Sequence, residues 1–179
     1  HKTTYRFGNQ TTYGLKQLRV LPKERESQKI VSWDVTLAGA KKELEFEDQH
    51  QNHVILASID DGAHEVVIES AGRIETIDTS GVVGAHGGFA PLWYFRRSTP
   101  LTRAGRNVVA LAARLPEDED MLARMHALSA LIKGEVTYEV GATGVDTTAD
   151  QAIELGAGVC QDHAHIMIAA ARRLGLPAR

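Results

Sequence analysis

The sequence predicts an α+β protein, in which an N-terminal antiparallel β-sandwich is followed by a helical part. Up to residue 80, apolar and polar residues alternate in about seven short segments separated by turn signals, which is typical of a sandwich. After Pro100 the apolar residues recur with helical spacing. We therefore expect a β-sandwich domain over residues 1–80, a linker over 81–100 and a helical part over 101–179.

The expected strands follow from local alternation and from the turns between them. Residues 31–37 alternate cleanly, which predicts a strand with one buried face. Ala38-Gly39-Ala40 favours a turn, and Asp60-Asp61-Gly62 closes the apolar run of residues 54–59 with a strong turn signal. The other expected strands carry Thr3, Tyr5 and Phe7; Leu18 and Val20; Leu44 and Phe46; Val66 and Ile68; and Ile74 and Ile77.

Residues 81–100 are expected to form a flexible linker because they contain four glycines and are punctuated by Pro91 and Pro100. The linker contains an aromatic cluster at residues 92–95. This cluster could form a wall of a substrate cleft. The favoured interpretation is that it docks the linker onto one domain, since large aromatic side chains mostly serve packing.

Several helices are expected before the last one. Thr102 is a fair N-cap for a helix that carries apolar residues as far as Leu115. Four acids, residues 117–120, precede a helix with an apolar stripe over 121–132; they are expected to face water near the helix dipole rather than to bind metal. Thr148 and Gln151 predict a capping box for a short helix that ends near Gly156.

The last helix begins near the only cysteine, Cys160. We expect it to be buried nearly all round as far as Arg172, with one face formed by Ala164, Met167, Ile168 and Ala171. At a helix start the free backbone N–H groups and the dipole favour a negative charge, and the thiolate is the nucleophilic form of cysteine. Cys160 is therefore the candidate catalytic nucleophile; the alternative is a small core residue.

The segment Gly-Val-Cys-Gln-Asp-His-Ala-His, with the Arg-Arg-Leu-Gly-Leu-Pro-Ala-Arg that ends the chain, resembles the nucleophile segment of the bacterial transglutaminase-like and cysteine protease family. The opening His-Lys-Thr-Thr-Tyr-Arg-Phe, the Leu-Arg-Val-Leu-Pro segment and the stretch from Asp48 to Val54 resemble the β domain with which such proteins often begin. The resemblance implies a papain-like transglutaminase core, with Cys160 as its nucleophile. The partner histidine and aspartate match no residue here and are expected beyond Arg179.

A thiolate nucleophile would attack an amide or ester carbonyl and form a thioester, which water or an amine resolves. We favour hydrolysis, so the expected function is that of the N-terminal part of a cysteine peptidase or amidase that acts on protein or peptide amides and is inactive as this segment. The alternative is a non-catalytic binding module with a remnant core. If strands that normally cover the last helix are missing, its apolar face should favour homo-oligomers.

Two histidines near Cys160 invite other interpretations. A zinc site is disfavoured because His163 and His165, two apart on a helix, point about 200° from each other. His163 is a neighbour of Cys160 on a helix and could act as its base. In the resembling family, however, the base comes from a distant strand.

Composition narrows the possible partners. The net charge of −3 gives no reason to expect nucleic acid or an anionic membrane surface. A single cysteine excludes an internal disulfide and favours a reducing compartment, and no apolar run is long enough to span a bilayer. We expect a cytoplasmic bacterial protein without cofactor or bound metal; the alternative location is that of a processed exported protein.

Overall fold

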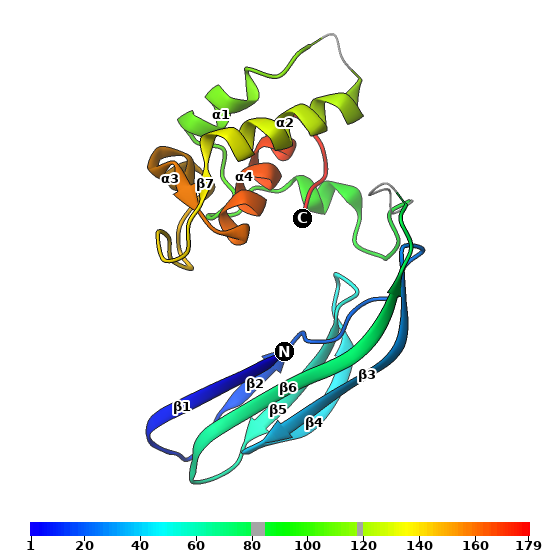
Figure 1. Ribbon diagram of the computed structural model, residues 1–179, viewed down its shortest axis with the longest axis vertical. Coiled ribbons are helices and arrows are strands. Elements are labelled where there is room, and N and C mark those ends of the chain that lie inside the picture. Colours follow the sequence, from blue (N-terminus) through cyan, green and yellow to red (C-terminus); the bar gives the residue numbers. More distant parts are fainter. Residues whose placement is uncertain (80–84, 118–119) are drawn as a thin grey trace. The chain divides into compact units, whose positions relative to one another are not determined.

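A computed structural model describes residues 1–79, 85–117 and 120–179 of the chain (Figure 1). The chain divides into two compact units, His1–Ala90 and Pro91–Arg179. The first unit contains antiparallel sheets and the second is mainly helical. The predicted α+β class is therefore confirmed.

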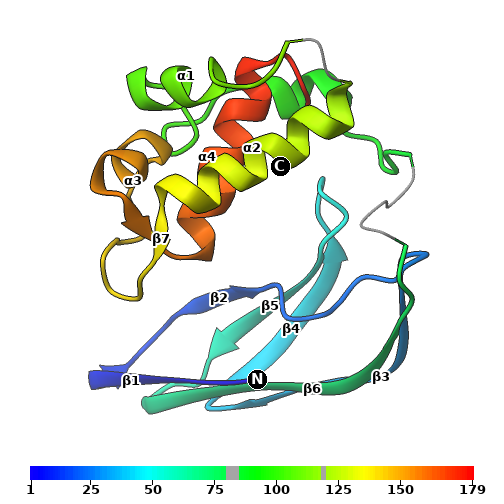
Figure 2. The same ribbon diagram turned by 45° about the horizontal axis from the view of Figure 1, so that its top comes forward.

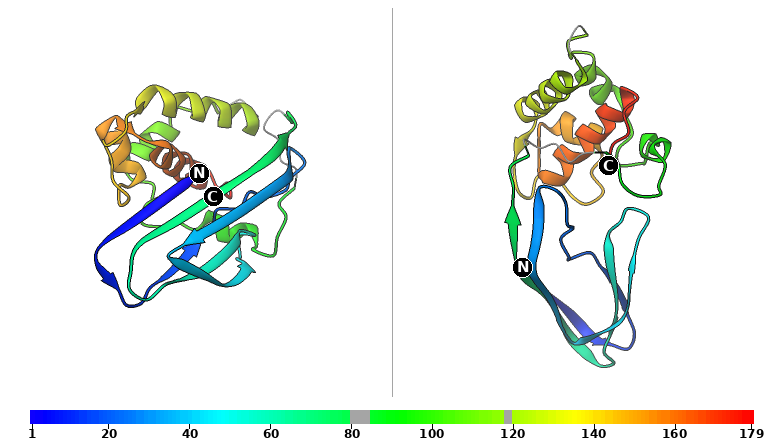
Figure 3. Two further views of the ribbon diagram at one scale, coloured as in Figure 1. Left: turned by 60° about the horizontal axis from the view of Figure 1, so that its bottom comes forward. Right: turned by 90° about the vertical axis from the view of Figure 1, so that its right-hand side faces the viewer.

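The N-terminal unit contains two three-stranded sheets. One has the order β1 (Lys2–Thr11), β6 (Ala63–Thr76), β3 (Gln28–Ala38), and the other has the order β2 (Leu15–Leu18), β5 (His53–Ile59), β4 (Ala40–Glu47). Neighbouring strands are antiparallel throughout. Leu18, Ile55 and Ile59 from one sheet share a buried core with Val66 and Ile68 from the other, so the sheets form a sandwich (Figure 3).

The unit has six described strands instead of the expected seven or so, because β6 is one long strand. Val66, Ile68 and Ile74, expected on two strands, all lie on it. Ala71 and Gly72 do not interrupt it, since they pair with Asp34 and Trp33 of β3. A Cβ at Gly72 would lie 2.2 Å from the Ser32 carbonyl oxygen, so this glycine permits close strand contact rather than a turn.

Both sequence-predicted turns are present. Gly39 joins β3 to β4, and Gly62 joins β5 to β6. They have φ values of 74° and 76°, in the left-handed region that favours glycine. Gly39 thereby takes the chain from one sheet to the other.

The connection between β4 and β5 is organised by the buried side chain of Asp48. Its carboxylate accepts hydrogen bonds from the backbone N–H groups of His50 and Asn52, from Asn52 Nδ2, and from Arg19 Nε at 3.0 Å. Burial alone would raise the pKa of Asp48, but these hydrogen bonds outweigh it and hold the pKa far below its ordinary value. The stretch of residues 48–54 is thus a locked loop of the sandwich.

The C-terminal unit is built around its last helix (Figure 2). Its elements are η1 (Leu92–Arg96), α1 (Arg106–Ala112), α2 (Met121–Glu135), β7 (Thr137–Tyr138), α3 (Ala149–Leu155), β8 (Ala157–Gly158) and α4 (Cys160–Arg173). α4 packs against α1, α2 and α3. Val108, Leu128 and Ile166 are fully buried in the shared core, and β7 and β8 form a short parallel pair.

The expected start of the first helix is wrong. α1 begins at Arg106, and its free N–H groups at Asn107 and Val108 donate to Asp150 Oδ1 at 2.9 and 3.0 Å. The carboxylate of Asp150, which lies on a later helix, therefore caps the start of α1 in place of Thr102. The side chain of Thr102 is buried at another position. The helix also ends at Ala112 rather than at Leu115.

The next two helices begin with side-chain caps. Asp120 accepts a hydrogen bond from the N–H of Ala123 at the start of α2, whereas residues 118 and 119 of the acidic run lie outside the described residues. The apolar stripe of α2 is shorter than expected, since Met121 and Leu122 are exposed. Thr148 forms the predicted capping box of α3 together with residue 151, and α3 ends at a left-handed Gly156.

The aromatic cluster forms the 3-10 helix η1 instead of an irregular linker. Phe95 is buried, and its carbonyl oxygen accepts hydrogen bonds from the N–H of Ala178 and from Arg172 Nε. This part of the cluster is docked on its own unit, as favoured from the sequence. Trp93 is exposed. Of the four linker glycines, Gly81 and Gly84 lie outside the described residues.

Candidate functional site

Cys160 is the first residue of α4, as the sequence predicts. Its side chain is exposed, and no hydrogen bond to its thiol occurs within the described ranges of the chain. Val159 precedes it as the N-cap residue in extended conformation. The thiol is therefore not a core group in this structure, which removes the basis of the packing interpretation.

The start of α4 offers backbone donors beside this thiol. The N–H groups of Asp162 and His163 donate to the carbonyl oxygen of Val159 at 3.0 and 3.1 Å. The N–H groups of Cys160 and Gln161 precede these bonds, and in the described structure neither has a backbone acceptor. Donors of this kind can bind the oxygen of a carbonyl group that comes close to the sulfur.

Asp162 fixes this helix start. Its side chain is 1% exposed, and Oδ2 accepts hydrogen bonds from the N–H of Val159 at 2.8 Å and from Thr143 Oγ1 at 2.6 Å. A Cβ at Gly158 would lie 2.8 Å from this carboxylate, so the glycine gives it room. Sequence reasoning placed residue 162 only in a flanking motif. Its position as the third helical residue, typical of a capping acid, was a usable signal.

His163 does not have a free ring nitrogen. Nδ1 lies 2.9 Å from the carbonyl oxygen of Val159, and Nε2 lies 3.0 Å from that of Val136. A general base needs a nitrogen that faces the proton it removes. The ring of His163 instead links the first turn of α4 to Val136, the residue before β7. The hypothesis that His163 is the base of Cys160 is therefore not supported.

His165 is half-buried, and its Nδ1 atom has no hydrogen-bond partner in the part of the chain that the structure describes. Within the same residues, no group of three or more His, Cys, Asp or Glu side chains is arranged to hold a metal ion. The geometry therefore adds no support to the disfavoured zinc interpretation.

The expectation that α4 is buried nearly all round is wrong. The buried positions are Asp162, Ile166, Ala169 and Ala170, which form one helical stripe, and the adjacent Ala171. Ala164 is exposed, one turn after Cys160, and residues 167 and 168 are only half-buried. Alanine is weakly hydrophobic and distributed around this helix, so the sequence pattern did not identify the face that packs.

The end of α4 is held by Arg172. Its Nη1 donates to Thr102 Oγ1 at 2.7 Å, and its Nη2 donates to the carbonyl oxygen of Ala178 at 2.8 Å. Gly175 has a φ of 82°, as expected of a left-handed helix cap. Helix α4 is thus fixed at both ends by side chains that form hydrogen bonds with backbone or hydroxyl groups.

A cavity of about 700 Å³ lies between the loop of residues 142–147 and α3. Thr143 donates to Asp162, and Gln161 Nε2 lies 3.4 Å from the carbonyl oxygen of Val145. The loop that forms one wall is therefore bonded to the two residues that follow Cys160.

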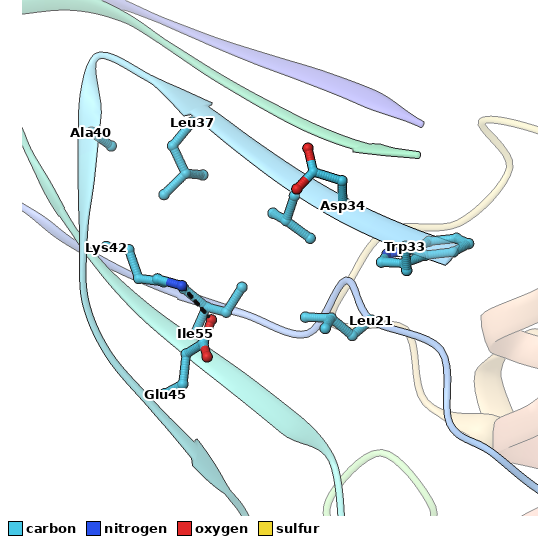
Figure 4. A pocket seen from close by; sticks show the side chains of 9 residues that line it. Leu21, Trp33, Asp34, Leu37, Ala40, Lys42, Glu45 and Ile55 are labelled. Atoms are coloured by element: carbon cyan, nitrogen blue, oxygen red, sulfur yellow. Dashed lines mark hydrogen bonds and ion pairs between the residues drawn. The ribbon is translucent and has the colours of Figure 1, made fainter. Parts of the chain in front are cut away.

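A second cavity, of about 380 Å³, opens between the sheets of the N-terminal unit along β3 and β4, which are edge strands (Figure 4). Leu21, Val35, Leu37 and Ile55 are among its apolar lining residues. The register of β4 shifts between Lys42 and Leu44. Lys42 pairs with Ala57 before the shift, and Glu45 pairs with Ile55 after it; both partners are buried core residues. The ion pair of Lys42 and Glu45, at 2.8 Å, lies at the cavity, as the figure shows.

None of the helices in the described residues has both the length and the apolar character needed to cross a membrane.

Comparisons with known proteins agree with both units. Residues 1–75 match the model of the bacterial transglutaminase-like N-terminal region, and residues 109–179 match that of the transglutaminase-like superfamily. An uncharacterised protein of Mycobacterium leprae is 22% identical over 192 aligned residues, which cover all of this chain and 67% of the relative.

A solved crystal structure of a candidate cysteine protease from Cytophaga hutchinsonii is similar, with a TM-score of 0.75 and 19% identity. The similarity covers 98% of this chain and 62% of that one, so this chain spans less than two thirds of the solved protein. At this identity the likeness shows the fold.

The two matched segments follow each other in the order of the two structural units, and the second includes Cys160 and all of α4. The N-terminal unit therefore contains a bacterial transglutaminase-like N-terminal region, and the C-terminal unit contains a segment of the transglutaminase-like superfamily.

Proposed function

We propose that this chain carries the nucleophile of a transglutaminase-like cysteine hydrolase, a peptidase or amidase that acts on protein or peptide amides. The observation that carries the proposal is the exposed thiol of Cys160 at the first residue of α4, beside two N–H groups that have no backbone acceptor in the described part of the chain. The match of residues 109–179 to the transglutaminase-like superfamily and the name of the Cytophaga structure support it.

In the proposed reaction the sulfur of Cys160 attacks the amide carbonyl carbon, and a carbon–sulfur bond forms. The N–H groups of Cys160 and Gln161 bind the negative oxygen of the intermediate. The carbon–nitrogen bond then breaks, and the amine leaves with a proton. Water attacks the thioester, the carbon–sulfur bond breaks, and the acid and the free thiol are released.

The proposal assigns the general base to no residue of this chain. The thiol has no hydrogen-bond partner within the described residues, and both ring nitrogens of His163 lie against carbonyl oxygens. We therefore propose that the 179-residue chain does not turn over peptide amides. Hydrolysis by this chain that disappears in Cys160→Ala would contradict that part of the proposal.

The test of the nucleophile compares alkylation rates. Iodoacetamide should modify Cys160 in the folded chain faster at neutral pH than it modifies an unstructured peptide of residues 157–163, because only the folded chain places the sulfur at a helix start with backbone N–H donors beside it. Mass spectrometry identifies the modified residue, and Cys160→Ser is the control for the site. A folded chain that reacts no faster than the peptide would refute the activated nucleophile.

A second candidate function, a binding module based on the N-terminal unit, is favoured by the cavity between its sheets (Figure 4). Such a module would accept an apolar group between Leu37 and Ile55. The fluorescent probe 8-anilinonaphthalene-1-sulfonate should bind to the folded chain and be excluded by Leu37→Trp, which fills the cavity, while Cys160→Ser retains binding. Equal binding by Leu37→Trp would exclude this site.

A further inference from the structure

One wall of the cavity between residues 142–147 and α3 is joined to the first turn of α4 by hydrogen bonds. Its loop wall is bonded to Asp162 through Thr143, at 2.6 Å, and to Gln161 through the carbonyl oxygen of Val145, at 3.4 Å. Asp162 is itself buried and bonded to the residue before Cys160. The loop wall of the cavity is therefore attached to the helix start that carries the thiol.

The lining of this cavity combines apolar and acidic side chains. Val145 and Leu155 contribute apolar surface and are 76% and 56% exposed. Asp146 and Glu154 contribute carboxylates, and no basic side chain is among the lining residues that the structure describes. Glu154 is paired with Arg106 at 3.1 Å, whereas Asp146 forms no ion pair within the described residues.

This lining has the character that a lysine or arginine side chain requires. Such a side chain has an apolar stem and a charged end, and it lays the stem on apolar surface while the end reaches a polar partner. Val145 and Leu155 can contact the stem, and Asp146 can pair with the charge. An acidic side chain would meet two carboxylates instead, which disfavours it.

We propose that this cavity is a specificity subsite for a basic residue of the peptide substrate, close to the amide that Cys160 attacks. The proposal rests on the proposed function, because it takes Cys160 as the reacting group. Asp146 determines the preference for positive charge, and the loop of residues 142–147 holds Asp146 in place through its bonds to α4.

The experiment alkylates Cys160 with two chloroacetyl peptides that differ at one residue, lysine or norleucine, next to the reactive group. The rate ratio of lysine to norleucine is measured within each protein, so that changes in thiol reactivity cancel. For the unmodified chain we expect a ratio of about two to five, the range of an exposed ion pair. The ratio should fall towards one as salt is raised, because exposed charges are screened.

Three variants test the assignment. Asp146→Asn should bring the ratio close to one, and Asp146→Lys should bring it below one. Glu117→Gln is the matched control: it removes one exposed carboxylate from the same unit, outside the cavity lining, and should keep the ratio of the unmodified chain. Circular dichroism checks that each variant is folded.

The result that overturns the subsite is a ratio that stays the same in both Asp146 variants, or a ratio near one in the unmodified chain. This failure differs from failure of the proposed function, which iodoacetamide reports without any peptide. An exposed cysteine of ordinary reactivity would still reveal charge preference in the peptide probes.

Discussion

Replacing Gly158 by alanine should destabilise the helical unit, although the change adds only one methyl group. The added Cβ would lie 2.8 Å from both Cβ and Oδ2 of Asp162, closer than such contacts normally occur. Asp162 cannot easily move away, because it is 1% exposed and accepts hydrogen bonds from Val159 and Thr143. The substitution must therefore displace the carboxylate or the backbone.

The magnitude follows from these two responses. Overpacking a filled site costs about 1–3 kcal/mol. Loss of a hydrogen bond to a charged group costs about 1.5–3 kcal/mol. The two costs do not add fully, because a carboxylate that moves away loses its hydrogen bond but also relieves the overpacking. We therefore expect a loss of about 2–3 kcal/mol in the free energy of unfolding.

Gly134 provides a matched control. This residue lies on α2 and is exposed, and a Cβ added there would have no heavy atom within 4 Å. Gly134→Ala should therefore stabilise the helix by about 0.5–1 kcal/mol, because alanine loses less backbone entropy on folding. The same chemical change is expected to act with opposite sign at the two positions.

The assay is urea unfolding followed by far-ultraviolet circular dichroism, in which the helices dominate the signal. The midpoint should fall for Gly158→Ala and rise for Gly134→Ala, with similar slopes. Equal effects of the two substitutions would refute the claim that close contact with Asp162 restricts residue 158. Iodoacetamide reactivity of Cys160 should also change in Gly158→Ala, because the start of α4 must shift.

Three further predictions concern other contacts. Asp150→Ala should lower the stability of the helical unit by about 1–2 kcal/mol, because it removes the cap of α1; urea unfolding measures this, and an effect no larger than that of Glu117→Gln would contradict it. Asp48 has a lowered pKa, so its stabilisation is complete above the unfolded pKa of about 3.9 and is lost as pH falls towards its lower folded pKa. Unfolding followed by the fluorescence of Trp33, in a Trp93→Phe background, should become less sensitive to acid in Asp48→Asn, and unchanged acid sensitivity would contradict the assignment. If the open side of α4 associates with a second copy, size-exclusion elution should depend on concentration and Ala164→Glu should abolish this; elution as a monomer at all concentrations would count against self-association.

The features that could be predicted from the sequence are those set by neighbouring residues. Gly39 and Gly62 form turns because glycine readily adopts positive φ, and the capping box of Thr148 needs only a residue three positions later. The start of α4 at Cys160 is of the same kind. Such contacts close within a few residues, so their partners are visible in the sequence.

The features that were missed depend on residues far apart in the chain. The cap of α1 comes from Asp150, 43 positions after Asn107, and no local pattern nominates it. Thr102 looked like a cap because its type suits one, but its hydroxyl accepts from Arg172, 70 positions away. Which side of α4 is buried is likewise decided by the helices that pack on it, since alanine suits either side.

The contacts around Cys160 show how an exposed residue at a helix start can be held in place. An exposed first residue of a helix is poorly fixed unless the turn before it is held. Here Gly158 lets the buried Asp162 approach the chain, Asp162 binds the N–H of Val159, and His163 ties the first turn to Val136. These contacts use the N–H of the N-cap residue, whereas the N–H groups of residues 160 and 161 have no backbone acceptor among the described residues. The helix start is therefore held in place by Gly158, Asp162 and His163 rather than by a bond to the thiol. Substituting any of these residues should change the rate at which Cys160 is alkylated, although the thiol itself stays intact.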